Sequence, residues 1–162
     1  MMKKYAKYMP MSGFPAKKGS ALQISTSVLK DKETVRLFVE MAPQIKDKPP
    51  SGSTESPFDW NQKIFMALKE EEVGRFLACL RGRVGEMNLI HKFPIDAPKE
   101  EQKTSKLLVK QGEYNDTINW LVNLKQKIGL NDEVGYSVYL QPEEAEILIV
   151  LLEDCIRKMY RL

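Results

Sequence analysis

The sequence is poor in the residues that usually carry redox, metal or membrane chemistry. It has only two cysteines and one histidine in 162 residues. Cys79 and Cys155 both fall in apolar, helix-like stretches, which favours buried reduced thiols over a disulfide or a metal site. No apolar run approaches the roughly 18 residues that span a bilayer. We therefore expect no metal, no cofactor and no membrane partner.

The amino-terminal stretch also lacks targeting features. Residues 1–15, "MMKKYAKYMPMSGFP", have neither a continuous apolar segment of the secretory type nor the arginine of a transit peptide. We expect a basic flexible tail over 1–15 and a single domain over 16–162, which is long enough for a core of its own. A stretch rich in proline, serine and lysine predicts a mobile loop at about 44–57.

Side-chain alternation is the main structural signal. In "FDWNQKIFMALKEEEVGRFLACL" (58–80), the residues from Trp60 to Leu68 alternate as in a strand, and the period then becomes helical. Acidic residues open this helix and Gly82 follows its last turn, as expected at helix ends. The same alternation predicts further strands at 18–29, 34–42, 84–93, 103–112 and 117–127. The last two should form a hairpin, with Ile118, Trp120, Val122 and Leu124 facing inward.

The end of the chain repeats the change from strand to helix. Placing Leu68 on Leu140 aligns Glu72 with Glu144, at a constant offset of 72 residues. Each half therefore consists of antiparallel strands followed by one helix. The predicted class is α+β, with two sheets and two helices.

The second helix carries more apolar surface than one stripe. Ile147 to Leu152 are six consecutive apolar residues, which cover every side of a helix. One side can pack on the sheets, and the other is covered most economically by the same helix of another copy. We expect a homo-oligomer contact at Ile147, Ile149 and Leu151. The alternative is a helix buried wholly within a monomer.

The outward positions of the predicted strands carry the functional signal, because cations, amides and aromatic rings are interleaved there. These positions are Gln23, Ser25, Arg36, Phe38, Lys63, Phe65, Lys106, Lys110, Asn123, Lys125 and Lys127. Single-stranded nucleic acid suits this mixture, since cations follow the phosphates and aromatic rings stack on unpaired bases. The alternative is a solvated sheet face with two incidental phenylalanines.

Five segments resemble the Whirly family in order and spacing. They are "KGSAL" (18–22), "FDWNQKIFMALKEEEVGRFL" (58–77), "MNLIH" (87–91), "WLVNLKQKIGLNDE" (120–133) and "VYLQPEEAEILIVLLEDCI" (138–156). The resemblance implies two antiparallel four-stranded sheets packed crosswise, with the helices at the centre of a tetramer. This fold is shared with the positive cofactor four coactivators. It also implies binding of single-stranded DNA with little sequence demand.

The resemblance assigns individual positions as well. It places Lys18, Gly19, Ala21 and Leu22 in a signature strand, adds Lys18 to the candidate nucleic-acid-binding residues, and makes Asp59 and Trp60 the start of the third strand. The chain departs from the family at Ser20, where the family has lysine, and in the insertion-like "KDKPPSGSTES" (46–56). With no targeting segment, these departures favour a bacterial or phage relative in the cytoplasm, including association with a nucleoid.

No enzymatic chemistry is expected. His91 is assigned a structural role, and Glu70, Glu71 and Glu72 are explained by the helix start rather than by an acid–base pair. No metal-ligand spacing, nucleophile elbow or phosphate loop occurs. We predict a sequence-tolerant binder of single-stranded DNA that serves replication, recombination, repair or transcription. Two alternatives are an RNA-binding protein of the same fold and a protein interaction scaffold without nucleic-acid affinity.

Overall fold

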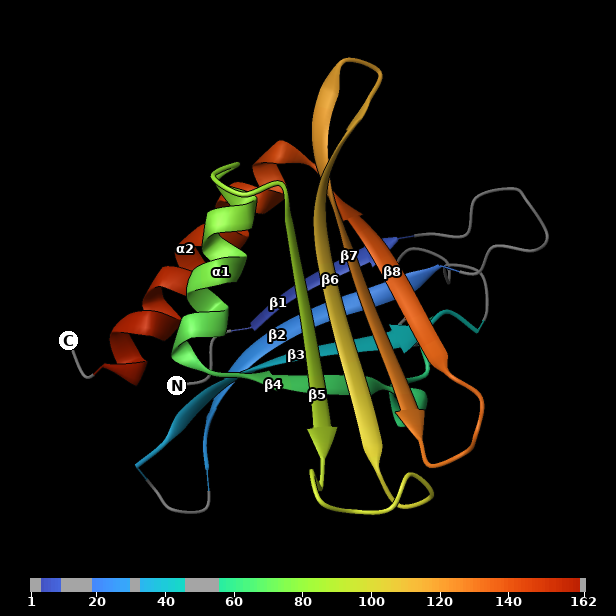
Figure 1. Cartoon of the computed structure of the whole chain (residues 1–162). Helices are drawn as coiled ribbons and strands as arrows, with labels where there is room; N and C mark the ends of the chain where they lie inside the picture. Colours follow the sequence, from blue (N-terminus) through green and yellow to red (C-terminus); the bar gives the residue numbers. More distant parts are fainter. Residues whose placement is uncertain (1–3, 10–18, 30–32, 46–55, 161–162) are drawn as a thin grey trace.

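Two sheets and two α-helices make up the structure, a computed structural model that describes residues 19–29, 33–45 and 56–160 and the backbone of 4–9 (Figure 1). The strands are β1 (Lys4–Met9), β2 (Ser20–Val28), β3 (Val35–Pro43), β4 (Ile64–Leu68), β5 (Glu86–Phe93), β6 (Lys103–Tyr114), β7 (Thr117–Ile128) and β8 (Val134–Leu140). The helices are the 3₁₀ helix η1 (Trp60–Gln62), α1 (Glu70–Leu80) and α2 (Pro142–Met159).

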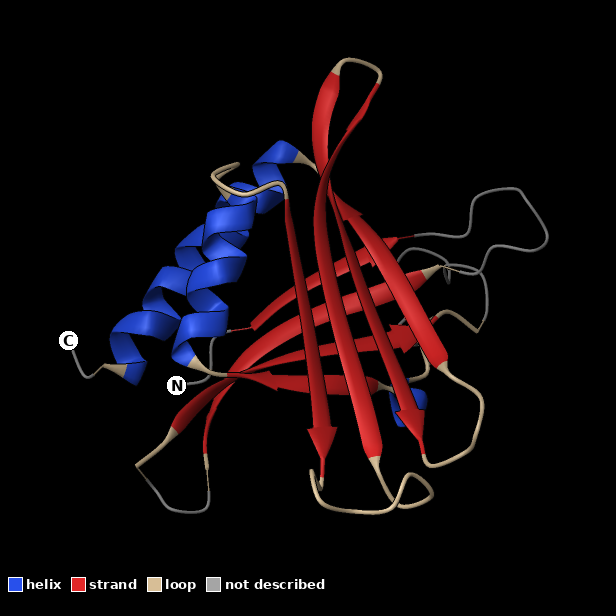
Figure 2. Cartoon of the chain, in the orientation of Figure 1, coloured by secondary structure: helices blue, strands red, loops and turns tan. Residues whose placement is uncertain are grey.

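Both sheets are antiparallel and follow the chain order. The first sheet is β1-β2-β3-β4 and the second is β5-β6-β7-β8. The two sheets cross face to face, and α1 and α2 lie side by side next to the crossing (Figures 1 and 2). The predicted α+β class, with two crossed four-stranded sheets and two helices, is confirmed.

The duplication extends to the hydrogen bonds that start the two α-helices. The carboxylate of Glu72 accepts a hydrogen bond from the backbone N of Lys69 at 2.9 Å. The carboxylate of Glu144 accepts one from the backbone N of Gln141 at 3.2 Å. In each case the third helical residue reaches back to the residue before the helix. The two strand ends therefore turn into helix by the same local interaction.

The core lies between the inner faces of the sheets and under the helices. Leu68 and Leu140 end β4 and β8 and are fully buried. Phe76 of α1 and Leu148 of α2 are fully buried too and also lie 72 residues apart. All four belong to one apolar cluster that contains residues of both sheets. Burial of this shared cluster joins the two halves into one unit.

Part of the predicted tail is a strand. Residues Lys4–Met9 pair with β2, from Lys4 opposite Ser25 to Met9 opposite Ser20. The segment is short and rich in lysine, which is typical of an edge strand and gives only a weak sequence signal. Residues 1–3 and 10–15 of that tail and 46–55 of the predicted loop lie outside the described residues. Gln44, at the start of that loop, forms a bridge with Phe58.

Two apolar residues lie elsewhere than predicted. Trp60 belongs to η1 rather than to a strand, because Asp59 accepts a hydrogen bond from the backbone N of Asn61 at 3.0 Å and starts a helical turn. The Trp60 side chain packs on a small buried cluster that includes Phe58. Ile118 is 45% exposed, not buried. The β6–β7 hairpin extends beyond the other strands, so no facing sheet covers it (Figure 1).

Helix α2 also differs from the prediction. Ile149 is only 7% exposed and belongs to the core of its own chain, so its place in a predicted contact between copies is wrong. Ile147 and Val150 are 52% and 61% exposed, and Leu151 is partly buried. The exposed apolar face of α2 therefore consists of Ile147, Val150 and Leu151.

Candidate nucleic-acid interface

The predicted binding residues divide between two surfaces. Since the inner faces of the sheets pack on each other, their outer faces point in opposite directions (Figure 1). Gln23, Ser25, Arg36, Phe38, Lys63 and Phe65 belong to the first sheet or its margin, and Lys106, Lys110, Asn123, Lys125 and Lys127 belong to the second. One protomer therefore does not bring the set together in a single patch. Lys18 lies outside the described residues.

An aromatic pair with a neighbouring cation lies where the two sheets meet. The rings of Phe38 and Phe65, on β3 and β4, have centroids 6.2 Å apart. The Nζ of Lys103, from the second sheet, lies 3.9 Å from the centroid of the Phe65 ring, and burial lowers the pKa of this lysine. Phe65 is 38% exposed, and the ammonium group of Lys103 covers one face of its ring. We call Phe38, Phe65 and Lys103 the aromatic edge.

A buried amide fixes the second sheet against this edge. The Nε2 of Gln126, on β7, donates to the carbonyl O of Phe65 at 3.2 Å and lies 3.3 Å from the Oγ of Ser105. Gln126 and Ser105 are 8% and 6% exposed. Hydrogen bonds at such low exposure position β4 firmly. The placement of Phe65 therefore depends on residues of both halves of the chain.

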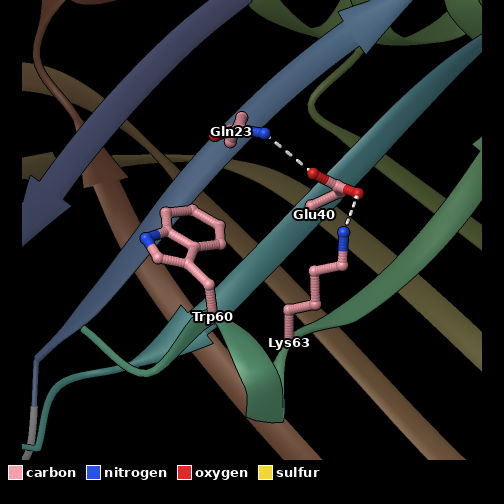
Figure 3. A pocket seen from close by; sticks show the side chains of 4 residues that line it. All are labelled: Gln23, Glu40, Trp60 and Lys63. Atoms are coloured by element: carbon pink, nitrogen blue, oxygen red, sulfur yellow. Dashed lines mark hydrogen bonds and ion pairs between the residues drawn. The ribbon is translucent and has the colours of Figure 1, made fainter. Parts of the chain in front are cut away.

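One carboxylate links three polar side chains beside the aromatic edge. Glu40 is the cross-strand neighbour of Phe65. Its Oε2 accepts a hydrogen bond from Nε2 of Gln23 at 2.8 Å, and its Oε1 accepts one from Nζ of Lys63 at 2.8 Å. The indole of Trp60 lies across from this chain of groups, and the four side chains line a depression of about 250 Å³ (Figure 3).

Two predicted residues of the first sheet have little free polar surface. Ser25 is only 7% exposed, and its cross-strand neighbour is the bulky Phe38. The predicted outward binding position Ser25 is therefore buried and offers little surface to a ligand. The Nη1 of Arg36 donates to the carbonyl O of Val35 at 3.2 Å and lies 3.9 Å from the carboxylate of Glu70, at the start of α1.

The second sheet presents a lysine-rich outer face. The carboxylate of Glu133 lies 3.5 Å from Nζ of Lys106 and 3.8 Å from Nζ of Lys125. Lys110 and Lys127 are exposed and have no carboxylate partner within the described residues. The side-chain amide of Asn123 forms hydrogen bonds within the sheet. Its Nδ2 donates to the carbonyl O of Tyr136 at 3.2 Å and to Oγ of Ser137 at 2.7 Å.

Several exposed groups were missing from the predicted set. Ile90 and Lys92 of β5 and Tyr139 of β8 lie on the outer face of the second sheet, where Ile90 and Tyr139 are 55% and 48% exposed. Alternation in β8 could have identified Tyr139, because its neighbours Val138 and Leu140 are buried. No local signal identifies Lys103, which reaches an aromatic ring of the other sheet.

The remaining candidate chemistry is structural. No three His, Cys, Asp or Glu side chains in the described part of the chain are grouped so that they could hold a metal ion. The Nε2 of His91 lies 2.6 Å from Oε1 of Glu72 and connects β5 to α1. Both cysteines are buried free thiols, and burial raises the pKa of Cys155 to about 11. None of the described helices is long and apolar enough to cross a membrane.

Comparison with solved structures identifies the architecture. WHY3 from Arabidopsis thaliana matches with a TM-score of 0.69 and 16% identity, over 98% of this chain and 88% of that chain. The plant transcriptional regulator PBF-2 matches with a TM-score of 0.69 and 14% identity, over 99% of this chain and 83% of that chain. The chain has the Whirly fold. MRP1/MRP2 from a trypanosome has a TM-score of 0.64 and 14% identity, over 99% of this chain and 95% of that chain.

These likenesses establish the Whirly fold alone, because the identities are only 14–16%. No protein-family model matches the sequence, and no curated protein matches it significantly. The three structures described above come from plants and a trypanosome and give no support to the predicted bacterial or phage origin.

Proposed function

We propose that this Whirly-fold protein binds single-stranded DNA with little dependence on sequence. The aromatic edge carries the proposal, since an exposed Phe65 ring lies beside Phe38 and 3.9 Å from the Nζ of Lys103. An unpaired base can stack on such a ring while a cation attracts the neighbouring phosphate. Paired bases in a duplex do not expose their faces in this way.

The likeness to PBF-2, a plant transcriptional regulator, supports a role in transcription. Replication, recombination and repair also expose single-stranded DNA, so the proposal includes a role in these processes. Electrostatic attraction to the phosphates would give only weak binding. The formal net charge of the chain is only +3, and Glu40 and Glu133 offset three of the predicted lysines. Base stacking therefore has to supply much of the proposed affinity.

We propose further that the protomers assemble through their helices into a homotetramer. The exposed apolar face of α2 (Ile147, Val150 and Leu151) supports this arrangement. We infer that one DNA strand can then run from the aromatic edge of one protomer to the lysine-rich face of another. Linked sites of this kind raise the effective concentration of the second contact.

The test is a fluorescence-anisotropy titration of the whole chain with oligo-dT, RNA of the same length and duplex DNA. We expect the tightest binding to oligo-dT, with log affinity falling against log salt by about 0.7 per phosphate contact. Equal affinity for the duplex would contradict the proposal. Tighter binding to RNA would overturn the preference for DNA, and no binding at all would favour the protein interaction scaffold.

A further inference from the structure

We propose that the depression lined by Gln23, Glu40, Trp60 and Lys63 is a subsite for one guanine base. The inference rests on the proposed function, because it assigns the base that this part of the single-strand surface reads. The four residues come from β2, β3, η1 and the residue before β4 (Figure 3). They meet only because the first sheet brings three strands and the 3₁₀ turn together.

The order of polar groups along the depression matches one base edge. Lys63 Nζ, Glu40 Oε1 and Glu40 Oε2 follow one another as donor, acceptor and acceptor, and Gln23 ends the row (Figure 3). The Watson–Crick edge of guanine presents O6, N1–H and the N2 amino group, which are an acceptor, a donor and a donor. Lys63 Nζ and the two oxygens of Glu40 therefore each have a complementary group on guanine.

The carboxylate has capacity left for this contact. A carboxylate offers about four acceptor positions, and two of those on Glu40 are used by Gln23 and Lys63. The ammonium group of Lys63 has three donors, of which Glu40 takes one. The Glu40 side chain is only 13% exposed, so a bidentate bond to it forms in surroundings that screen charge less than water does.

The other bases fit this row less well. Thymine presents a single donor between two acceptors, so its carbonyl oxygens would meet the carboxylate. Adenine and cytosine each present one exocyclic donor beside a ring acceptor, so they can pair with Lys63 and with only one of the two oxygens of Glu40. A site that leaves polar groups unpaired rejects such ligands strongly.

The size and the neighbours of the depression also suit a single base. At about 250 Å³ it is smaller than the roughly 300–1,000 Å³ of sites that enclose whole small molecules. Trp60 supplies an aromatic wall, and the cross-strand neighbour of Glu40 is Phe65 of the aromatic edge. A strand stacked on Phe65 would therefore present an adjacent base to the depression.

The first test is competition against labelled oligo-dT by unlabelled oligo-dT that carries one central dG, deoxyinosine, dA or dC. We expect the dG oligonucleotide to compete at least about five-fold better than plain oligo-dT, as for a good bidentate base contact. Deoxyinosine lacks the N2 amino group and should lose most of this advantage.

Two matched variants assign the preference to Glu40. Glu40→Gln replaces one acceptor by a donor, so the dG oligonucleotide should compete no better than plain oligo-dT. Glu133→Gln removes a lysine-paired carboxylate from the second sheet and should keep the advantage. Circular dichroism of both variants establishes that they are folded.

The second test uses the free mononucleotides dGMP, dAMP, dCMP and dTMP and follows the indole N–H signals by NMR. The Trp60 signal should shift with dGMP and much less with the others. The Trp120 indole N–H, which donates to the carbonyl O of buried Cys79 at 3.0 Å, is the internal reference and should not move.

The outcomes separate the two proposals. Oligonucleotide binding without a dG advantage overturns the guanine subsite and leaves the proposed function in place. A dGMP-specific shift of Trp60 without any oligonucleotide binding overturns the proposed function and supports the depression as a guanine-nucleotide site. Absence of both effects overturns both.

Discussion

Gly129 shows how one residue fixes the end of a strand. It follows β7 with a φ of 57°, and its N donates to the carbonyl O of Gln102 at 2.9 Å. A Cβ at this position would clash with the backbone carbonyl of Glu100. The residue therefore combines a left-handed backbone with a close approach to the loop before β6, and both favour glycine.

Replacing Gly129 with alanine should lower the free energy of unfolding by about 1–2 kcal/mol or more, from the left-handed backbone and the clash together. Urea denaturation followed by circular dichroism measures the change. Gly85→Ala is the matched control, because a Cβ at Gly85 meets nothing within 4 Å. Equal losses in the two variants would show that the backbone of Gly129 carries no special constraint.

Cys155 gives a pH dependence whose sign follows from burial. Its pKa in the folded chain is raised from 9.0 to about 11. Between these two pH values the folded protein keeps the thiol proton of Cys155, whereas the unfolded chain has released it. The stabilisation is complete below pH 9 and is lost as the pH rises toward 11, at about 1.4 kcal/mol per pH unit. Urea midpoints from pH 8 to pH 10.5 should fall less steeply for Cys155→Ala. Identical slopes would rule out this thiol as a cause.

At the scale of elements, α2 has two apolar faces with different partners. Ile149 lies in the core of its own chain, whereas Ile147 and Val150 are more than half exposed. Ile147→Glu and Val150→Glu should therefore dissociate the proposed assembly without unfolding the protomer, as measured by light scattering and circular dichroism. Ile149→Glu should unfold the chain, because it buries an unpaired charge. An unchanged mass in both exposed-face variants would contradict assembly through this face.

The elements could be predicted where the signal is local. Alternation identified β2, β3 and β5–β7, and the capping glutamates Glu72 and Glu144 mark the two helix starts. The strand β1 could not be predicted, because its pairing depends on the distant edge of β2. The place of Trp60 depends on the Asp59 cap and on buried Phe58, which outweigh the side-chain alternation from Trp60 to Leu68.

At the scale of the whole molecule, the candidate site was only partly predictable. The alternation of side chains, with its period of two residues, predicts outward residues such as Phe38, Phe65 and Lys125. It does not show that the outer faces of the two sheets point in opposite directions. The partner of Lys63 is Glu40 on β3, 23 residues away along the chain, and the partner of Lys125 is Glu133, in the loop just before β8. Such pairs are set by register and by the crossing of the sheets, so no local pattern reports them.

The central claim is that an unpaired strand contacts the aromatic edge, and photocrosslinking tests it most directly. Oligo-dT containing 5-iododeoxyuridine would be irradiated with the whole chain, and the adducts would be mapped by mass spectrometry. We predict adducts at Phe38 or Phe65 that unlabelled single strands abolish and that duplex DNA does not. Adducts confined to Tyr139 and its neighbours on the second sheet, or equal competition by duplex DNA, would contradict the account.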